Sequence, residues 1–239
     1  MQTQYVTIPS PNGTLQGTIL SSPDFTGKRP ALLVIHGWTS AMHRYPSRVE
    51  AIVNMGYIVV LFDLRGHGQT GGELALLSPH DHLNDCLAAY DYMVSLEDVD
   101  KSNISVFGSS YGGYMASMLS AERKIDHMIL NVPADYPDDI FDKPDMQRSD
   151  HTTEYRKHPR QPHEARAMSA ISKYTGDLLF IEAEFDEQVN PQVMKNYLSA
   201  AKVGYDYELI KGADHSMRNP GADEARIKVM NKWFEKITG

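Results

Sequence analysis

The chain has 239 residues, 41% of them hydrophobic and 23% charged, with a formal net charge of -8. This composition is typical of a folded globular protein, and the acidic balance argues against a nucleic-acid partner, which needs clustered Lys and Arg. Cys86 is the only cysteine, which excludes an internal disulfide, and no apolar run approaches the roughly 20 residues of a membrane span. The first residues have neither a basic start nor an apolar run, so we expect a soluble, cytoplasmic protein without a signal peptide.

The first predicted element is a hairpin, because "QYVTI" and "LQGTIL" flank Asn12-Gly13 and would add an antiparallel edge to a sheet. Five continuous apolar runs follow, at 31–37, 57–63, 103–108, 127–131 and 178–183. Runs without polar alternation indicate strands that are buried on both faces. A sixth run, "YDYELI" at 205–210, is more polar and is typical of a strand at the sheet edge.

Helical patterns lie between these strands. The helix from about residue 80 to 94 has a start signal at Ser78-Pro79, and a later helix begins at Pro191 after a capping Asn190. The spacing of apolar residues in the first of these helices predicts an inward face formed by Leu83, Leu87, Tyr90 and Val94. In the final helix, over 222–237, it predicts an inward face formed by Ile227, Met230, Phe234 and Ile237. Alternating strands and helices predict an α/β fold, a mostly parallel, doubly wound sheet covered on both faces.

The segment 133–172 breaks this alternation, since it is polar, rich in proline and without a clear strand. A bare loop of that length is unusual, so we interpret it as a small cap inserted into a single domain that spans residues 1–239. Its aromatic residues Tyr136, Phe141 and Tyr155 could line a pocket for an aromatic acyl group, or could equally fill the core of the cap.

The stretch "SVFGSSYGGYMAS" at 105–117 holds the strongest functional signal. A strand ends at Gly108 and a helix starts after Ser110, which fits the G-x-S-x-G turn that exposes a nucleophilic hydroxyl at the carboxyl end of a strand. Glycines at 108 and 112 would remove Cβ atoms that clash in so sharp a turn.

A serine hydroxyl needs a base, and the base needs an acid that orients it. His215 in "GADHSM" and Asp186 in "FDEQVNP" each follow a predicted strand, in the chain order Ser, Asp, His that this architecture uses. Asp135 follows the preceding strand and stays as an alternative acid. Asp214 is discounted, because a residue adjacent to the histidine cannot easily turn to meet its ring.

The negative charge that develops on a substrate oxygen would need two donors. We predict the backbone N–H of Tyr111, at the start of a helix, and that of Trp38, in the loop after the first apolar run. The other histidines are assigned no chemistry. "HDH" at 80–82, with Asp85 nearby, matches no strong metal-ligand spacing and indicates a solvated helix end.

With these residues placed, the chain resembles the α/β-hydrolase superfamily over essentially its whole length, through "VIHGW", "FDLRGHGQT", "GSSYGG", "FDEQVNP" and "GADHSM". The resemblance implies a Ser110–His215–Asp186 triad, an oxyanion hole at Trp38 and Tyr111, a lid over 133–172 and a purely structural role for the loop 63–68. "SSYGGYMA" is similar to the elbow of prolyl-oligopeptidase-type peptidases, which carry a propeller for which this chain has no room. Compact size and a helical insert look more like small cinnamoyl/feruloyl esterases.

The expected activity is hydrolysis of small-molecule carboxylic esters with small or aromatic acyl groups, without a metal or cofactor. A peptidase or amidase acting on small peptides is the alternative, and a non-catalytic binding protein on the same fold is a further one. The early part of the predicted lid is acidic, at Asp135, Asp138, Asp139, Asp142 and Asp145, so we expect no activation at a lipid interface.

Overall fold

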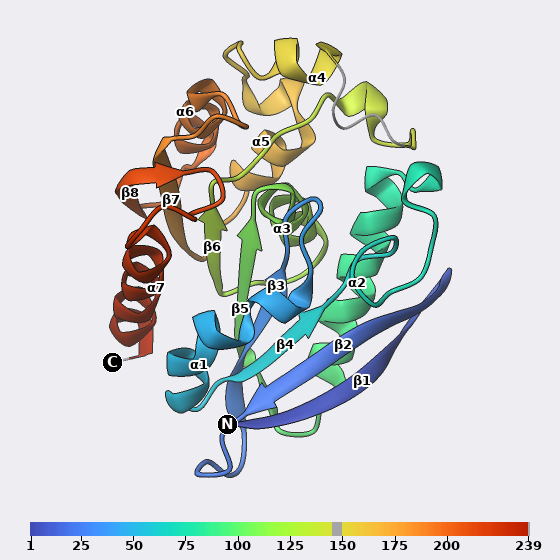
Figure 1. Ribbon diagram of the computed structural model, residues 1–239, viewed down its shortest axis with the longest axis vertical. Helices are drawn as coiled ribbons and strands as arrows, with labels where there is room; N and C mark the ends of the chain where they lie inside the picture. The colour runs from blue at the N-terminus through green and yellow to red at the C-terminus, as the bar shows by residue number, and fades with distance from the viewer. Residues whose placement is uncertain (145–149, 239) are drawn as a thin grey trace.

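In the computed structural model, which describes residues 1–144 and 150–238, one eight-stranded sheet crosses the molecule with helices on both faces (Figure 1). The strands lie in the order β1-β2-β4-β3-β5-β6-β7-β8. All pairs from β4 to β8 are parallel, and β2 pairs antiparallel with β4, so the predicted α/β fold is confirmed. The bounds are β1 Gln2–Ser10, β2 Gly13–Ser21, β3 Arg29–Ile35, β4 Ile58–Phe62, β5 Val99–Ser109, β6 His127–Asn131, β7 Asp177–Phe185 and β8 Tyr205–Asp214.

The antiparallel edge is the predicted hairpin of β1 and β2, shifted by one residue. Ser10 pairs with Gly13, so the two-residue loop is Pro11–Asn12 and not Asn12-Gly13. Gly13 has φ +134, a conformation that L side chains rarely adopt, and is the first residue of β2. β8 forms the opposite edge, as its polar sequence predicts.

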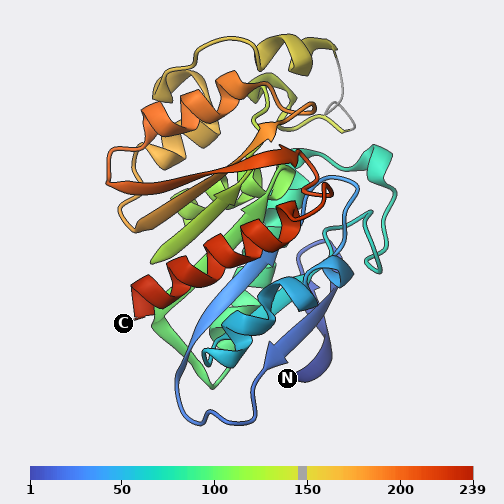
Figure 2. The ribbon, with the colours of Figure 1, turned by 60° about the vertical axis from the view of Figure 1, so that its left-hand side comes forward.

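Two helical layers cover the sheet, because strand side chains alternate between its faces. On one face, Leu32 and Val34 of β3 pack with helices α1 (Pro46–Asn54) and α7 (Ala222–Thr238). On the other, Leu33 and Ile35 belong to a larger core with α2 (Pro79–Ser95), α3 (Tyr111–Glu122), α5 (Arg166–Ile171) and α6 (Pro191–Ala200). Figure 2 shows α1 and α7 side by side on one side of the sheet.

The start of α2 agrees with the sequence, since the Ser78 side chain accepts from the Asp81 N–H in a capping box. Its predicted inward face is wrong in part. Leu83, Leu87 and Val94 are only partly buried, and the fully buried positions are occupied by His82, Asp85, Cys86, Ala89 and Met93. In α7, Met230 and Phe234 are buried as predicted, whereas Ile227 and Ile237 are partly exposed and Arg226 and Trp233 lie inside.

Between β6 and β7 the chain forms short helices: η3 (Asp138–Ile140), α4 (Asp150–Tyr155), η4 (Pro162–Glu164) and α5. In Figure 1 α4 lies at the top of the molecule, beyond the carboxyl end of β6. Asn196 of α6 donates to the carbonyl of His158, which ties this segment to the rest of the molecule. That residues 133–172 act as a cap on a single domain stays a prediction, and Asp145 lies outside the described residues.

No helix of the described part of the chain combines the length and the apolar character that crossing a membrane requires.

Candidate active site

The turn between β5 and α3 holds Ser110 in a strained conformation, with φ 53° and ψ -114°. The two glycines of the motif make the turn possible. A Cβ on Gly108 would lie 2.3 Å from the carbonyl oxygen of Gly112, and a Cβ on Gly112 would lie 2.1 Å from that of Ile35. Both distances are below any that real Cβ atoms show, so the motif is sterically required by the approach of α3 to β3 and β5.

Hydrogen bonds hold the strained serine in place. The Ser110 N–H donates to the carbonyl of Asn131 at 2.9 Å, and the Ser110 carbonyl accepts from the N–H groups of Gly113 and Ala134 at 2.9 and 3.0 Å. The backbone of Ser110 is therefore attached both to its own helix and to the end of β6.

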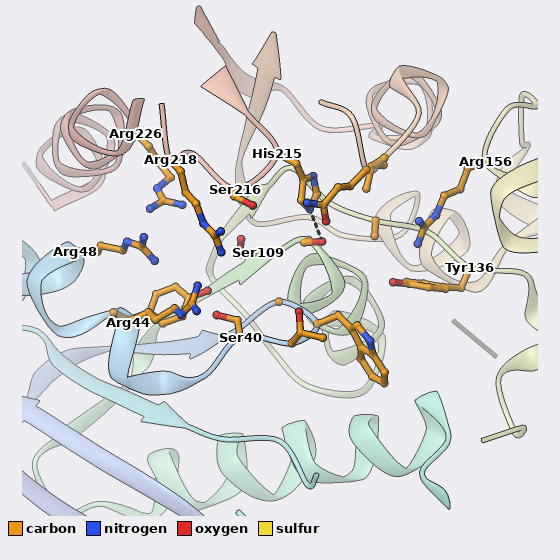
Figure 3. Close-up of a pocket in the computed structure, with 18 of the residues that line it drawn as sticks. Ser40, Arg44, Arg48, Ser109, Tyr136, Arg156, His215, Ser216, Arg218 and Arg226 are labelled. Atoms are coloured by element: carbon orange, nitrogen blue, oxygen red, sulfur yellow. Dashed lines mark hydrogen bonds between the residues drawn. The ribbon is translucent and has the colours of Figure 1, made fainter. Parts of the chain in front are cut away.

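The structure brings together three of the predicted residues at the carboxyl ends of β5, β7 and β8. His215 Nε2 lies 2.8 Å from Ser110 Oγ, and His215 Nδ1 lies 2.7 Å from Asp186 Oδ2 (Figure 3 shows the first contact). Because a carboxylate only accepts, Nδ1–H donates to Asp186 and Nε2 is left to accept the serine proton. The other carboxylate oxygen accepts from the N–H groups of Gln188 and Val189, which fixes its orientation.

The two other candidate acids lie elsewhere. Asp135 is buried and its Oδ2 accepts from the Tyr155 hydroxyl at 3.1 Å. Burial raises the pKa of Asp135 to about 7. Asp214 accepts from the N–H of Arg218. Of the three carboxylates, Asp186 is the one that contacts the histidine ring.

One predicted oxyanion donor, Tyr111, follows Ser110 in the chain, and the other, Trp38, lines the same cavity as Ser110. Trp38 follows β3 and lines the same cavity as Ser110, and Tyr111 is the first residue of α3. The Trp38 ring packs edge-on against Tyr111 and against His82. The use of their N–H groups as an oxyanion hole stays a prediction.

The prediction that "HDH" is a solvated helix end is wrong for its last histidine. His82 is completely buried, with Nδ1 2.8 Å from the Tyr111 hydroxyl, and burial lowers its pKa to about 3. Asp85 is also buried and accepts from the Arg65 side chain at 2.7 Å. These groups are hydrogen-bonded core residues, and within the described ranges no group of three His, Cys, Asp or Glu is placed to hold a metal ion.

A cavity of about 560 Å³ opens over Ser110 and His215. Of the three aromatic residues predicted to line it, Tyr136 does. Phe141 is buried in the larger core and stacks on His80 of α2, and Tyr155 is buried beside Asp135. Neither of them lines the cavity.

Five arginines also line the cavity, and the sequence analysis singled out none of them: Arg44, Arg48, Arg156, Arg218 and Arg226. The position of Arg218, three residues after His215, was the one local signal that could have pointed to them.

The strained serine at a strand-to-helix turn is hydrogen-bonded to a histidine, which is hydrogen-bonded to an aspartate. This arrangement, on an open and mostly parallel sheet, defines a serine hydrolase of the α/β-hydrolase fold. Residues 43–239 match the model of the prolyl oligopeptidase family, peptidase family S9, and the chain belongs to that family.

Two relatives matched by sequence are distant and longer than this chain. Dipeptidyl peptidase 8 of Homo sapiens is 24% identical over 235 residues, covering 88% of this chain and 26% of that protein. Acylamino-acid-releasing enzyme 1 of Oryza sativa is 23% identical, covering 87% of this chain and 30% of that protein. The chain thus spans between a quarter and a third of the length of these relatives.

Among solved structures, Est1E from Butyrivibrio proteoclasticus with ferulic acid bound superposes with a TM-score of 0.79 at 21% identity, covering 98% of this chain and 100% of that one. Porphyromonas gingivalis dipeptidyl peptidase 4 gives a TM-score of 0.74 at 20% identity, covering 98% of this chain and 35% of that one. At these identities the likeness shows a shared fold.

Proposed function

We propose that the protein hydrolyses carboxylic esters of small molecules through an acyl-enzyme on Ser110. The observation that carries the proposal is the continuous chain of contacts from Ser110 Oγ through the His215 ring to Asp186. The structure of Est1E, which matches over nearly the whole of both chains, holds ferulic acid, a carboxylic acid of the kind that ester hydrolysis releases, and this supports an ester as the substrate.

In the first half of the reaction, His215 Nε2 takes the Ser110 proton while Oγ attacks the ester carbonyl. The carbonyl oxygen becomes an oxyanion, held by the N–H groups of Trp38 and Tyr111. Each such donor is typically worth on the order of 10²–10³ in rate. The C–O bond of the alcohol then breaks, the alcohol leaves with the proton from His215, and Ser110 keeps the acyl group.

In the second half, a water molecule gives its proton to His215 and its oxygen attacks the acyl carbon. The bond to Ser110 Oγ breaks, Oγ recovers the proton, and the carboxylic acid leaves. Asp186 holds the imidazole tautomer and stabilises the imidazolium in both halves. These steps use only side chains and backbone groups of the chain itself.

The second candidate is a peptidase or amidase acting on small peptides. The family match and the dipeptidyl peptidase relatives favour it, and the same triad would serve a peptide bond. A binding protein without activity is the third reading, which the intact Ser110–His215 contact disfavours.

The test compares chromogenic esters of graded acyl length with aminoacyl anilides on the purified protein. We expect ester hydrolysis, labelling of Ser110 by a fluorophosphonate, and a fall in kcat of about 10⁴ or more in Ser110→Ala and in His215→Ala, with no further fall in the double variant. An unchanged rate in Ser110→Ala would remove the assignment, and anilide hydrolysis without ester hydrolysis would replace the esterase with the peptidase. The cytoplasmic location also stays a proposal, testable by cell fractionation.

A further inference from the structure

The cavity over Ser110 has the opposite charge to the rest of the molecule. The chain carries 31 Asp and Glu against 23 Lys and Arg. Yet five arginines line the cavity, and no Asp or Glu does so among the described residues. Guanidinium groups gathered beside a reactive serine are costly to the folded protein, because like charges repel one another. Such a concentration therefore indicates a ligand that compensates it.

Four of these arginines form one group, which we name the arginine subsite: Arg44, Arg48, Arg218 and Arg226. They come from four separate elements, namely η1 (Met42–Arg44), α1, the segment after β8, and α7. Figure 3 shows all four on one side of Ser109 and His215, with the fifth, Arg156, on the other side next to Tyr136.

The protein's own acidic groups do not neutralise the arginine subsite. Arg48 and Arg226 share a single carboxylate, that of Asp223. Arg44 and Arg218 are exposed, and neither forms an ion pair with any residue in the described parts of the chain. Four positive charges thus face one negative charge.

Arg226 provides a second, independent sign that a partner is missing. Its side chain is only 4% exposed, yet its Nε has no hydrogen-bond partner in the described structure. A buried donor on a charged group is normally paired, since leaving it unpaired costs more than a neutral donor would. Burial, together with the nearby Arg48, lowers the pKa of the Arg226 guanidinium.

Hydroxyl groups complete the surroundings. Ser40, Ser109 and Ser216 line the same side of the cavity and are labelled between the arginines and His215 in Figure 3. Guanidinium forks and hydroxyls together are the donors that proteins use for carboxylate and phosphate oxygens, which accept two parallel N–H bonds from one arginine.

We propose that the arginine subsite binds an oxyanion, a carboxylate or a phosphate, carried by the substrate, so that the protein acts on anionic esters. This inference rests on the proposed ester hydrolysis for its catalytic part. A neutral acyl or alcohol group placed there would take water from Arg44 and Arg218 without pairing them, and would leave the buried Nε of Arg226 without a partner, which selects against it.

The catalytic test uses matched ester pairs that differ only in charge: the 4-nitrophenyl monoester of succinic acid against its methyl-capped diester, and 4-acetoxybenzoate against its methyl ester. We expect kcat/KM to favour the anionic member of at least one pair by tenfold or more at low salt. This preference should fall about tenfold in Arg218→Gln and in Arg44→Gln, and should shrink with added salt. The matched control, Arg123→Gln, removes an arginine paired with Asp91 outside the cavity and should keep the preference.

A binding test separates this inference from the proposed function. Calorimetry on Ser110→Ala with succinate and with inorganic phosphate should show binding that Arg218→Gln weakens and Arg123→Gln does not, and the stronger of the two identifies the oxyanion. Ester hydrolysis without charge preference in either pair, and without binding of either anion, would overturn the subsite and leave the esterase standing. Anion binding by a protein that hydrolyses no ester would overturn the esterase and keep the subsite.

Discussion

The substitution Gly112→Ala tests whether the turn between β5 and α3, which presents Ser110, is held by close backbone packing. The new Cβ would lie 2.1 Å from the carbonyl oxygen of Ile35 and 2.7 Å from that of His36. Neither atom is the end of a flexible side chain, so the backbone after β3 must move away from α3. Contacts of this kind are not accepted below 3.0 Å, and the required displacement is therefore about 1 Å.

Two effects follow from that displacement. Overpacking of this size lowers the free energy of unfolding by about 3 kcal/mol, the upper end for small-to-large changes, because backbone has to move. Ile35 and His36 also lead directly into Gly37 and Trp38, so a predicted oxyanion donor moves with them. A misplacement of about 1 Å costs on the order of 10² in kcat/KM.

Urea unfolding and hydrolysis of a chromogenic ester measure the two effects. The matched control is Gly204→Ala, because a Cβ on Gly204 has no atom within 4 Å and its φ is not positive. We expect that control to stay within about 0.5 kcal/mol of the original protein and to keep its activity. If Gly112→Ala unfolds at the same urea concentration as Gly204→Ala and is equally active, the steric reasoning about the elbow is wrong.

The triad and the buried histidines give two further predictions. Asp186→Asn should lower kcat by about 10⁴, and Asp135→Asn far less, because only Asp186 contacts His215; equal losses in steady-state kinetics would contradict that assignment. Burial lowers the pKa of His36 and of His82 to about 3. Below pH 6.5 these two histidines therefore bind protons in the unfolded chain but not in the folded protein. Their contribution to the free energy of unfolding, present above pH 6.5, should fall by up to about 1.4 kcal/mol per pH unit for each histidine. Asp135, whose pKa burial raises to about 7, takes up a proton in the folded protein over the same range and opposes this fall. The histidine contribution is therefore measured by an NMR titration of the two rings from pH 7 to pH 5, and a ring that titrates near pH 6.5 would refute the prediction.

The strands and the elbow were predictable because their causes are local in the sequence. Strands buried on both faces need continuous apolar runs, and those runs mark β3, β4, β5, β6 and β7. The glycines at 108 and 112 are required by contacts within one turn and its neighbouring strand. The five-residue motif is therefore enough to predict the turn and its serine from the sequence.

The inward face of α2 was not predictable from periodicity. His82 and Asp85 are polar, and polar residues at a helix start normally face water, so the pattern favoured Leu83 and Leu87 instead. Their burial depends on partners far away in the chain, the Tyr111 hydroxyl and the Arg65 side chain. No window of sequence around α2 contains those partners.

The arginine subsite was hidden for a related reason. Its four members are dispersed from residue 44 to residue 226, in four different parts of the chain. Each arginine alone reads as an ordinary surface charge. Only the convergence of four chain segments at the carboxyl end of the sheet makes them one group, and that convergence is a property of the fold.

Both backbone polar groups of Ala134 form hydrogen bonds. Its N–H donates to the Ser110 carbonyl at 3.0 Å, and its carbonyl accepts from the Tyr197 hydroxyl at 2.9 Å. Ser110 and the start of the insertion between β6 and β7 are therefore joined through one residue, which α6 also holds. A substitution that displaces the Tyr197 hydroxyl would reach the nucleophile through two hydrogen bonds, although α6 lies far from that turn in the chain.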